Sequence, residues 1–248
     1  MRNDLALLRL DPLLWVVLLA IPIVVMTFMK PAFKPLLQAD GYAFANGSEQ
    51  TVPGLAVTFG FFNVTFLGIG FFREHIWSTW DRLRTMPVRG HEILLGKIIP
   101  AFFVICLQQA LLFGLGVVVF GFRSQGPAIA IFVVDASFVL WVMAFGFATL
   151  AYAKTFQQVL AVSNLGAIVC GGLGGGLTPI STLPDWTHTP AHYTPTWWAM
   201  RAFNKVILDG QGLEAVGRSV LVLLVAAAVL FVVGLARFSL NEPKGGTL

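Results

Sequence analysis

The segment TWDRLRTMPVRGHEILLGK, residues 79–97, is the most densely charged part of a chain that is otherwise largely apolar. One apolar run ends shortly before it, at Phe72, and another begins within it, at Ile93. A helix that crosses a membrane needs about 20 mostly apolar residues, and both runs are of this order. A short charged connection between two such runs predicts two membrane-spanning helices joined by a hairpin outside the membrane.

The composition places the whole chain in the membrane class. Of its 248 residues, 57% are apolar and 11% are charged, whereas soluble domains carry roughly 25% charged residues. The basic residues are dispersed along the chain, so no nucleic-acid partner is expected. Cys106 and Cys170 both lie within apolar runs, which argues against a disulfide framework or a zinc site.

Six apolar segments have the length and composition of membrane-spanning helices. They are residues 13–29, 55–72, 93–120, 128–152, 159–177 and 216–238. The preceding residues 1–11 alternate apolar and charged side chains, which suits a short amphipathic helix in the membrane interface. We therefore expect an all-α integral membrane protein with one transmembrane domain over residues 1–248.

The basic residues indicate an orientation. With both termini in the cytoplasm, 10 of the 16 Lys and Arg residues lie on the cytoplasmic side, as the positive-inside rule requires. Most of this excess comes from the connection 73–92 between the second and third spans. Multi-pass insertion with cytoplasmic termini is therefore the expected topology.

Large apolar residues recur every three positions in this connection and would form one stripe along a helix. They are Trp77, Trp80, Leu83 and Met86. The charged residues fall mostly off the stripe and are Glu74, Asp81, Arg82 and Arg84. Pro87 ends the helix, because proline disfavours helical geometry in the residue before it. The pattern predicts a short two-faced helix, or alternatively a basic loop that only fixes the topology.

The connection resembles the signature of the ABC type-2 transporter permeases, E-x-x-x-G-T-x-E-x-L-x-x-x-P-x-x-x-x-E-x-x-L-G-K. The matching residues are Glu74, Thr79, Leu83, Pro87, Glu92 and Leu95-Gly96-Lys97, with Asp81 replacing a glutamate. The similarity extends to the interfacial helix, the six spans, and a Pro- and Trp-bearing loop before the last span. The sequence departs from the family at Trp77-Ser78, where Arg-Gly is usual, and at Met86, where Thr is usual.

This resemblance implies that the connection is a coupling helix seated in a groove of a separate ATP-hydrolysing subunit. The residues it assigns to this contact are Glu74, Trp77, Trp80, Asp81, Arg82, Leu83, Arg84, Met86 and Pro87. It also implies two ATPase subunits and a second permease subunit, identical or paralogous. ATP and Mg would bind the ATPase, since this chain lacks the motif G-x-x-x-x-G-K-[ST]. No cofactor, metal ligand or catalytic residue is expected on this chain.

The segment 178–214 contains four prolines and three tryptophans. Tryptophan is enriched at the membrane–water boundary, so this segment could be a surface loop with aromatic anchors. It could instead dip back into the bilayer as short helices, where irregular backbone must be covered by protein. The glycine-rich run 171–176 before it favours close helix packing, with a flexible hinge as the alternative.

Several polar residues lie inside the predicted spans, where they are costly and usually face protein or a water-filled path. The candidates for a translocation pathway are Asn63, Phe66, Asp135 and Asn164. Asp135 lies either on a pathway or in a structural pair. The amides, which include Gln108 and Gln109, are more typical of hydrogen bonds between helices.

We therefore expect the permease subunit of an ATP-driven exporter for a small amphiphile, drug or antibiotic. Export of a lipid, glycolipid or polysaccharide is the alternative within the family. A proton-coupled secondary carrier that uses Asp135 is the alternative from another class. The expected location is the plasma or inner membrane of a bacterium or archaeon.

Overall fold

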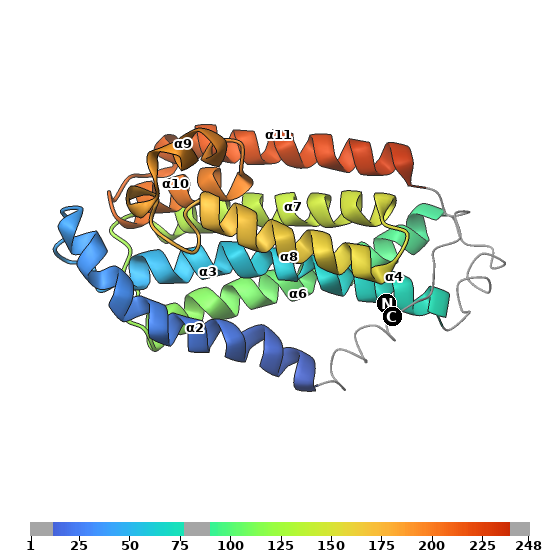
Figure 1. The fold of residues 1–248 in the computed structure, drawn as a ribbon, viewed down its shortest axis with the longest axis horizontal. Coiled ribbons are helices and arrows are strands. Elements are labelled where there is room, and N and C mark those ends of the chain that lie inside the picture. Colours follow the sequence, from blue (N-terminus) through green and yellow to red (C-terminus); the bar gives the residue numbers. More distant parts are fainter. Residues whose placement is uncertain (1–11, 77–89, 239–248) are drawn as a thin grey trace.

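The computed structural model describes residues 12–76 and 90–238. These residues form an elongated bundle of helices and contain no strand (Figure 1), which confirms the predicted all-α fold. The elements are α2 (Pro12–Ala39), α3 (Ser48–Phe62), α4 (Val64–Ile76), α6 (Gly90–Val118), α7 (Ala128–Tyr152), α8 (Phe156–Leu173), η1 (Ile180–Thr182), α9 (Asp185–Ala191), α10 (Pro195–Ile207) and α11 (Leu213–Arg237). The predicted interfacial helix, residues 1–11, lies outside the described residues.

Within the described part of the chain, six segments are long and apolar enough to cross a membrane. They are Ala20–Ala39, Ser48–Phe72, Leu95–Val118, Ala128–Tyr152, Phe156–Leu173 and Leu213–Arg237. Their number agrees with the prediction, but several bounds differ. The first helix continues through Lys30 to Ala39, where a loop was expected, and the second span begins at Ser48 rather than residue 55.

A buried cap explains the early start of α3. Asn46 Oδ1 accepts from the backbone N–H of Ser48 at 2.9 Å, and Glu49 Oε2 accepts from the backbone N–H of Asn46 at 2.9 Å. Such a reciprocal pair satisfies N–H groups that the first turn of a helix leaves free. Glu49 is fully buried, so this cap fixes the chain direction inside the bundle and leaves only residues 40–47 outside α2 and α3.

Glycines bring α3, α8 and α10 close together. A Cβ on Gly54 would lie 2.2 Å from Gly176 O, and one on Gly174 would lie 1.7 Å from Thr196 Oγ1. Gln50 also donates to Gly175 O at 2.7 Å. The glycine-rich run therefore serves close packing, and the break in regular helix at Gly174 ends α8 at Leu173 rather than at residue 177.

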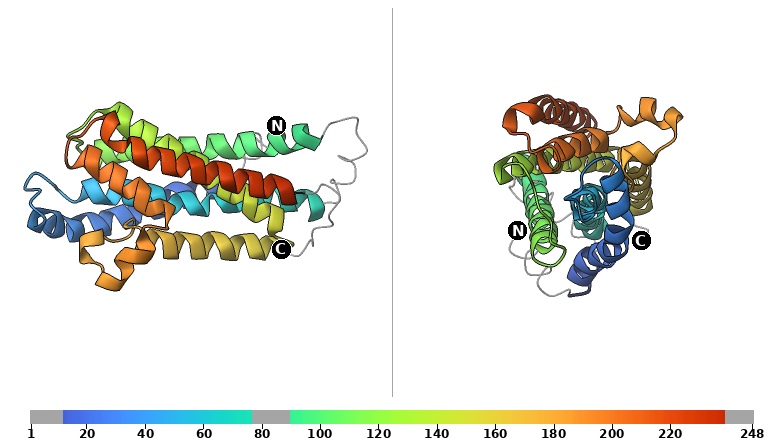
Figure 2. Two further views of the ribbon diagram at one scale, coloured as in Figure 1. Left: turned by 90° about the horizontal axis from the view of Figure 1, so that it is seen from above. Right: turned by 90° about the vertical axis from the view of Figure 1, so that its left-hand side faces the viewer.

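The bundle is built around α7, which packs most extensively against α11 and also contacts α10, α4 and α6. Gly234 allows α11 to approach α7, because a Cβ there would lie 2.8 Å from Phe147 Cδ1. The end of α4 at Ile76 and the start of α6 at Gly90 lie at the same end of the bundle (Figures 1 and 2). We call this end the hairpin end. Helices α9 and α10 lie at the opposite end, which we call the α10 end.

The segment 178–214 contains η1, α9 and α10, and α10 is part of the bundle core. Thr194 caps α10 by accepting from the backbone N–H of Trp197 at 3.3 Å, and Pro195 occupies its first turn. The fully buried apolar side chains of α10 are Ala199, Met200, Ala202, Phe203, Val206 and Ile207. Helix α10 contacts α11, α7, α3 and α8. It therefore lies within the protein rather than across its surface.

Candidate functional site

A cluster of amide side chains joins the second and third spans. Asn63 Nδ2 donates to Gln108 Oε1 of α6, and Gln109 Nε2 donates to Ala56 O of α3 at 3.0 Å. All three amide side chains are buried. The expected hydrogen bonds between helices are therefore present for these amides, and Asn63 lies inside the protein, where α3 gives way to α4.

Asp135 lines a groove of about 420 Å³ between α6 and α7. Its neighbours in the groove include Cys106 and Gln109 from α6 and Phe132 from α7. Asp135 is half-buried, and none of the described residues forms a hydrogen bond or an ion pair with its carboxylate. An unpaired carboxylate is unusual at membrane depth, where acidic residues normally have a partner or face water.

The groove opens on the side of the bundle. Phe132 is 66% exposed and Val117 is 56% exposed, and both line it. Phe113 forms the inner wall and packs against Phe203 of α10, with ring centroids 5.7 Å apart. A ligand could therefore enter from the side, and its inner contacts would reach the core helix α10.

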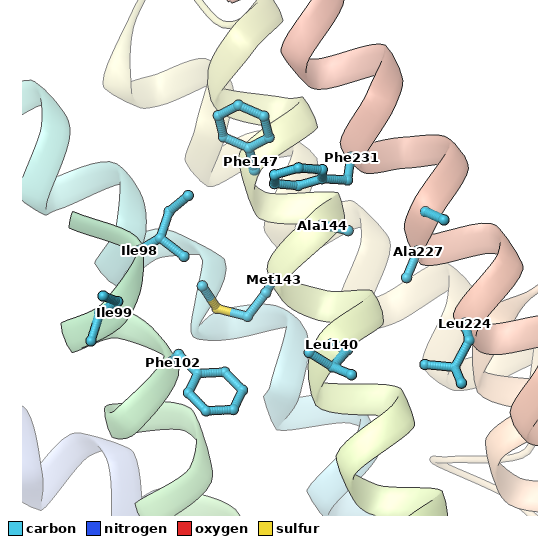
Figure 3. Close-up of a pocket in the computed structure, with 11 residues that line it drawn as sticks. Ile98, Ile99, Phe102, Leu140, Met143, Ala144, Phe147, Leu224, Ala227 and Phe231 are labelled. Atoms are coloured by element: carbon cyan, nitrogen blue, oxygen red, sulfur yellow. The ribbon is translucent and has the colours of Figure 1, made fainter. Parts of the chain in front are cut away.

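A second cavity of about 400 Å³ shares Phe102 with the groove and lies toward the hairpin end. Figure 3 shows the residues that line it. Helices α6, α7 and α11 supply its walls, and Phe102 lines both the groove and this cavity. Phe147 and Phe231 close one side of it, with ring centroids 5.2 Å apart (Figure 3). Its lining residues are all apolar, so it provides a hydrocarbon-like space next to the groove that Asp135 lines.

The structure does not gather the four pathway candidates at one place. Asn63 is buried between helices, Phe66 is half-buried on α4, and Asn164 is exposed on α8. Helices α6 and α8 lie on different sides of α3 (Figure 2). The groove of Asp135 and the exposed face of Asn164 are therefore separate surfaces of this chain.

The residues assigned to ATPase coupling lie at or beyond the limits of the described chain. Glu74 belongs to the last turn of α4. The remaining eight lie outside the described residues and are Trp77, Trp80, Asp81, Arg82, Leu83, Arg84, Met86 and Pro87. Their assignment therefore stays a prediction from the family resemblance.

Four groove residues were not recognised as site candidates from the sequence: Phe102, Cys106, Phe113 and Phe132. On α6 a spacing signal exists, because Cys106, Gln109 and Phe113 recur at three and four residues and so share one helix face. Phe132 precedes Asp135 by one helical turn. Since aromatic residues are common throughout the spans, this signal did not distinguish a groove from lipid-facing positions.

Comparison with known proteins identifies relatives among membrane permeases. The model of the family described as ABC-2 type transporter matches residues 1–208. The chain is 30% identical over 158 residues to the linearmycin resistance permease protein LnrN of Bacillus subtilis, covering 64% of this chain and 41% of that protein. It is 24% identical over 177 residues to the probable multidrug ABC transporter permease YbhR of Escherichia coli, covering 70% and 47% respectively.

A third relative comes from Dictyostelium discoideum. The chain is 24% identical over 195 residues to ABC transporter G family member 20 of Dictyostelium discoideum, covering 77% of this chain and 26% of that protein. This chain therefore spans less than half the length of each of these three relatives. No solved structure gives a significant match.

Proposed function

The chain belongs to the ABC-2 type transporter family, and from this premise we propose that it is the permease subunit of an ATP-driven exporter. The proposed substrate is a small amphiphilic compound, such as a drug or an antibiotic. The observation that carries this proposal is the pair of adjoining cavities between α6, α7 and α11, of about 420 and 400 Å³. Cavities of this size hold drug-sized molecules, and their apolar walls suit a compound that partitions into membranes.

The names of two relatives support this substrate class. One is a linearmycin resistance permease and the other a probable multidrug permease. Lipid, glycolipid or polysaccharide export remains the alternative within the family. A polysaccharide would need polar walls for its hydroxyl groups, whereas the cavity in Figure 3 is lined by apolar residues alone.

The energy source is proposed to be a separate ATPase that binds ATP and Mg, present in two copies. The sequence contains no phosphate-binding loop of the G-x-x-x-x-G-K-[ST] type, so hydrolysis would occur on that partner. The helix predicted between α4 and α6 would dock into the ATPase and transmit its movements to both spans. The hairpin end is then cytoplasmic, and the protein lies in the plasma or inner membrane of a bacterium or archaeon with cytoplasmic termini.

A second permease subunit, identical or paralogous, would complete the assembly. The exposed amide of Asn164 supports its placement against α8, because a polar side chain at membrane depth is costly when it faces lipid. The second subunit could also approach α8 closely at Gly172, where an added Cβ would meet nothing within 4 Å. The assembly would then move substrate outward by alternating access.

Purification of the tagged chain from its native membrane tests this proposal. We expect an ABC ATPase to co-purify and its ATP hydrolysis to rise when a candidate amphiphile is added. Asp135, unpaired among the described residues, favours one competing function, a proton-coupled carrier. That carrier would purify without an ATPase and would move substrate down a pH gradient in the absence of ATP.

A further inference from the structure

Two hydrogen-bond acceptors without a donor belong to residues that line the α6–α7 groove. One is the carboxylate of Asp135, which has no partner among the described residues. The other is Oε1 of Gln109, a side chain that lines the groove and is 1% exposed. The Gln109 Nε2 bond to Ala56 O, 3.0 Å long, fixes which end of the amide is left unpaired. The groove lining therefore carries an unpaired acidic group and, among the described residues, includes no basic residue.

A protonated amine suits this lining better than a metal ion does. In the parts of the chain that the structure describes, no cluster of three His, Cys, Asp or Glu side chains could hold a metal. An ammonium group supplies a positive charge to balance the Asp135 carboxylate. It also supplies N–H donors for unpaired acceptors. Hydrogen bonds between ionised partners are also stronger than those between neutral groups.

The walls of the groove suit the same group. Phe102, Phe113 and Phe132 line it, and the faces of aromatic rings attract cations, most strongly where water is excluded. The apolar cavity, whose lining is drawn in Figure 3, shares Phe102 with the groove. A cationic head near Asp135 would therefore have an adjoining space for a hydrocarbon tail that extends toward Phe147 and Phe231.

We propose that the α6–α7 groove binds amphiphiles that carry a protonated amine, with Asp135 as counter-ion and the adjoining cavity as the tail site. This rests on the proposed function in that it names the substrate class of the exporter. The binding itself requires neither ATP nor a partner subunit. It can therefore be tested separately from transport.

The test uses two photoactivatable probes of equal chain length, dodecylamine and 1-dodecanol, each with a diazirine in the chain. The purified protein is placed in nanodiscs of zwitterionic phosphatidylcholine, illuminated with each probe, and the adducts are located by mass spectrometry. We expect the amine to label residues of the groove and the adjoining cavity. An excess of unlabelled dodecylamine should suppress this labelling, and an excess of 1-dodecanol should not.

Substitution then separates the counter-ion from the fold. Asp135→Asn should reduce amine labelling about tenfold or more, because a charge-assisted hydrogen bond is lost, while Asp135→Glu retains it. Phe132→Ala should also reduce labelling, whereas Ile129→Ala, another exposed position of α7 outside the groove, should leave it unchanged. Equal labelling of unmodified protein by both probes, or suppression by 1-dodecanol, would overturn the proposal without any variant. If the amine labels the groove as expected but the complex does not export it, only the proposed transport function is refuted.

Discussion

Asn63 donates a side-chain hydrogen bond to Gln108 Oε1, and it does so at the single residue that separates α3 from α4. The backbone also turns there, since the N–H of Asn63 bonds to Gly60 O at 3.2 Å. The second span is thus broken near its middle, and the third span supplies the polar partner for the break. The bond ties the segment that leads to the hairpin end to α6 on the other side of the hairpin.

Asn63→Ala should therefore destabilise the protein. Interhelical side-chain hydrogen bonds in membranes contribute about 0.6 kcal/mol on average and up to about 2 kcal/mol, and we expect the upper part of this range because both side chains are fully buried. Unfolding in mixed micelles measures the effect. Asn164→Ala is the matched control, since that amide is exposed. Equal stability of the two variants would show that the Asn63 bond contributes nothing.

Gly54→Ala should lower the stability of the protein, although it adds only one methyl group. A Cβ at Gly54 would lie 2.2 Å from the backbone oxygen of Gly176, so α3 and the segment after α8 must separate. Overpacking of this kind typically costs about 1–3 kcal/mol. In Gly172→Ala the new methyl meets nothing within 4 Å, and alanine favours helix over glycine by about 1 kcal/mol. Thermal unfolding should show loss of stability in the first variant alone, and a similar loss in both would refute the packing argument.

Tyr42 at the α10 end should titrate at high pH. Its hydroxyl donates to Asp209 Oδ1 at 2.8 Å, and this bond, with partial burial and the negative charges of Asp209 and Asp40, raises the pKa of Tyr42 above 10.0. A raised pKa favours the protonated form in the folded state. The contribution to stability is therefore complete below pH 10.0 and is lost as pH rises through the folded-state pKa.

Tyrosinate absorbance measures this pKa in a variant that lacks the other two tyrosines, Tyr152→Phe/Tyr193→Phe. In that background, Asp209→Asn should lower the pKa of Tyr42 toward 10.0, because the acceptor loses its charge. Ser181→Ala is a nearby control, since it removes a hydrogen bond to Asp40 and leaves the Tyr42 bond in place. An unchanged titration in Asp209→Asn would show that the bond does not form in solution.

Leu83→Asp or Pro87→Gly should uncouple the transporter. An aspartate would place a charge in the apolar stripe that we propose fills the ATPase groove, and truncation or disruption of such an anchor typically costs about 2 kcal/mol or more. Substrate-stimulated ATP hydrolysis should fall sharply while the protein remains in the membrane fraction. Val88→Asp introduces the same charge off the stripe and should retain coupling. Normal export by the Leu83 variant would remove the coupling assignment.

The sequence was sufficient to predict the fold class and the number of spans, because hydropathy over about 20 residues decides both. It failed at the bounds where tertiary contacts override local pattern. Lys30 reads as the start of a loop, yet its Nζ donates to Phe120 O at 2.7 Å, which satisfies the charge within a continuing helix. Glu49 lies before the predicted start of the second span at residue 55, but its carboxylate accepts backbone N–H groups inside the bundle.

The candidate site was predicted only in part. Asp135 was identified because a carboxylate in a span is costly, but its partners could not be derived from spacing along one helix. The groove is formed by α6 and α7 together, and residues such as Phe113 and Phe132 become neighbours of Asp135 only after these helices pack. For Asn164 the sequence showed that a polar residue lies in a span, but it did not show which face of the bundle this residue occupies.

The central claim is that ATP hydrolysis on a partner drives an amphiphile across the membrane through this permease. The most direct test is transport by the co-purified complex in sealed proteoliposomes, followed with a fluorescent long-chain amine. We predict accumulation inside inverted vesicles that requires ATP and Mg outside and is not supported by a pH gradient alone. Accumulation driven by a pH gradient without ATP, unaffected by ATP and greater than that in protein-free vesicles, would contradict the account.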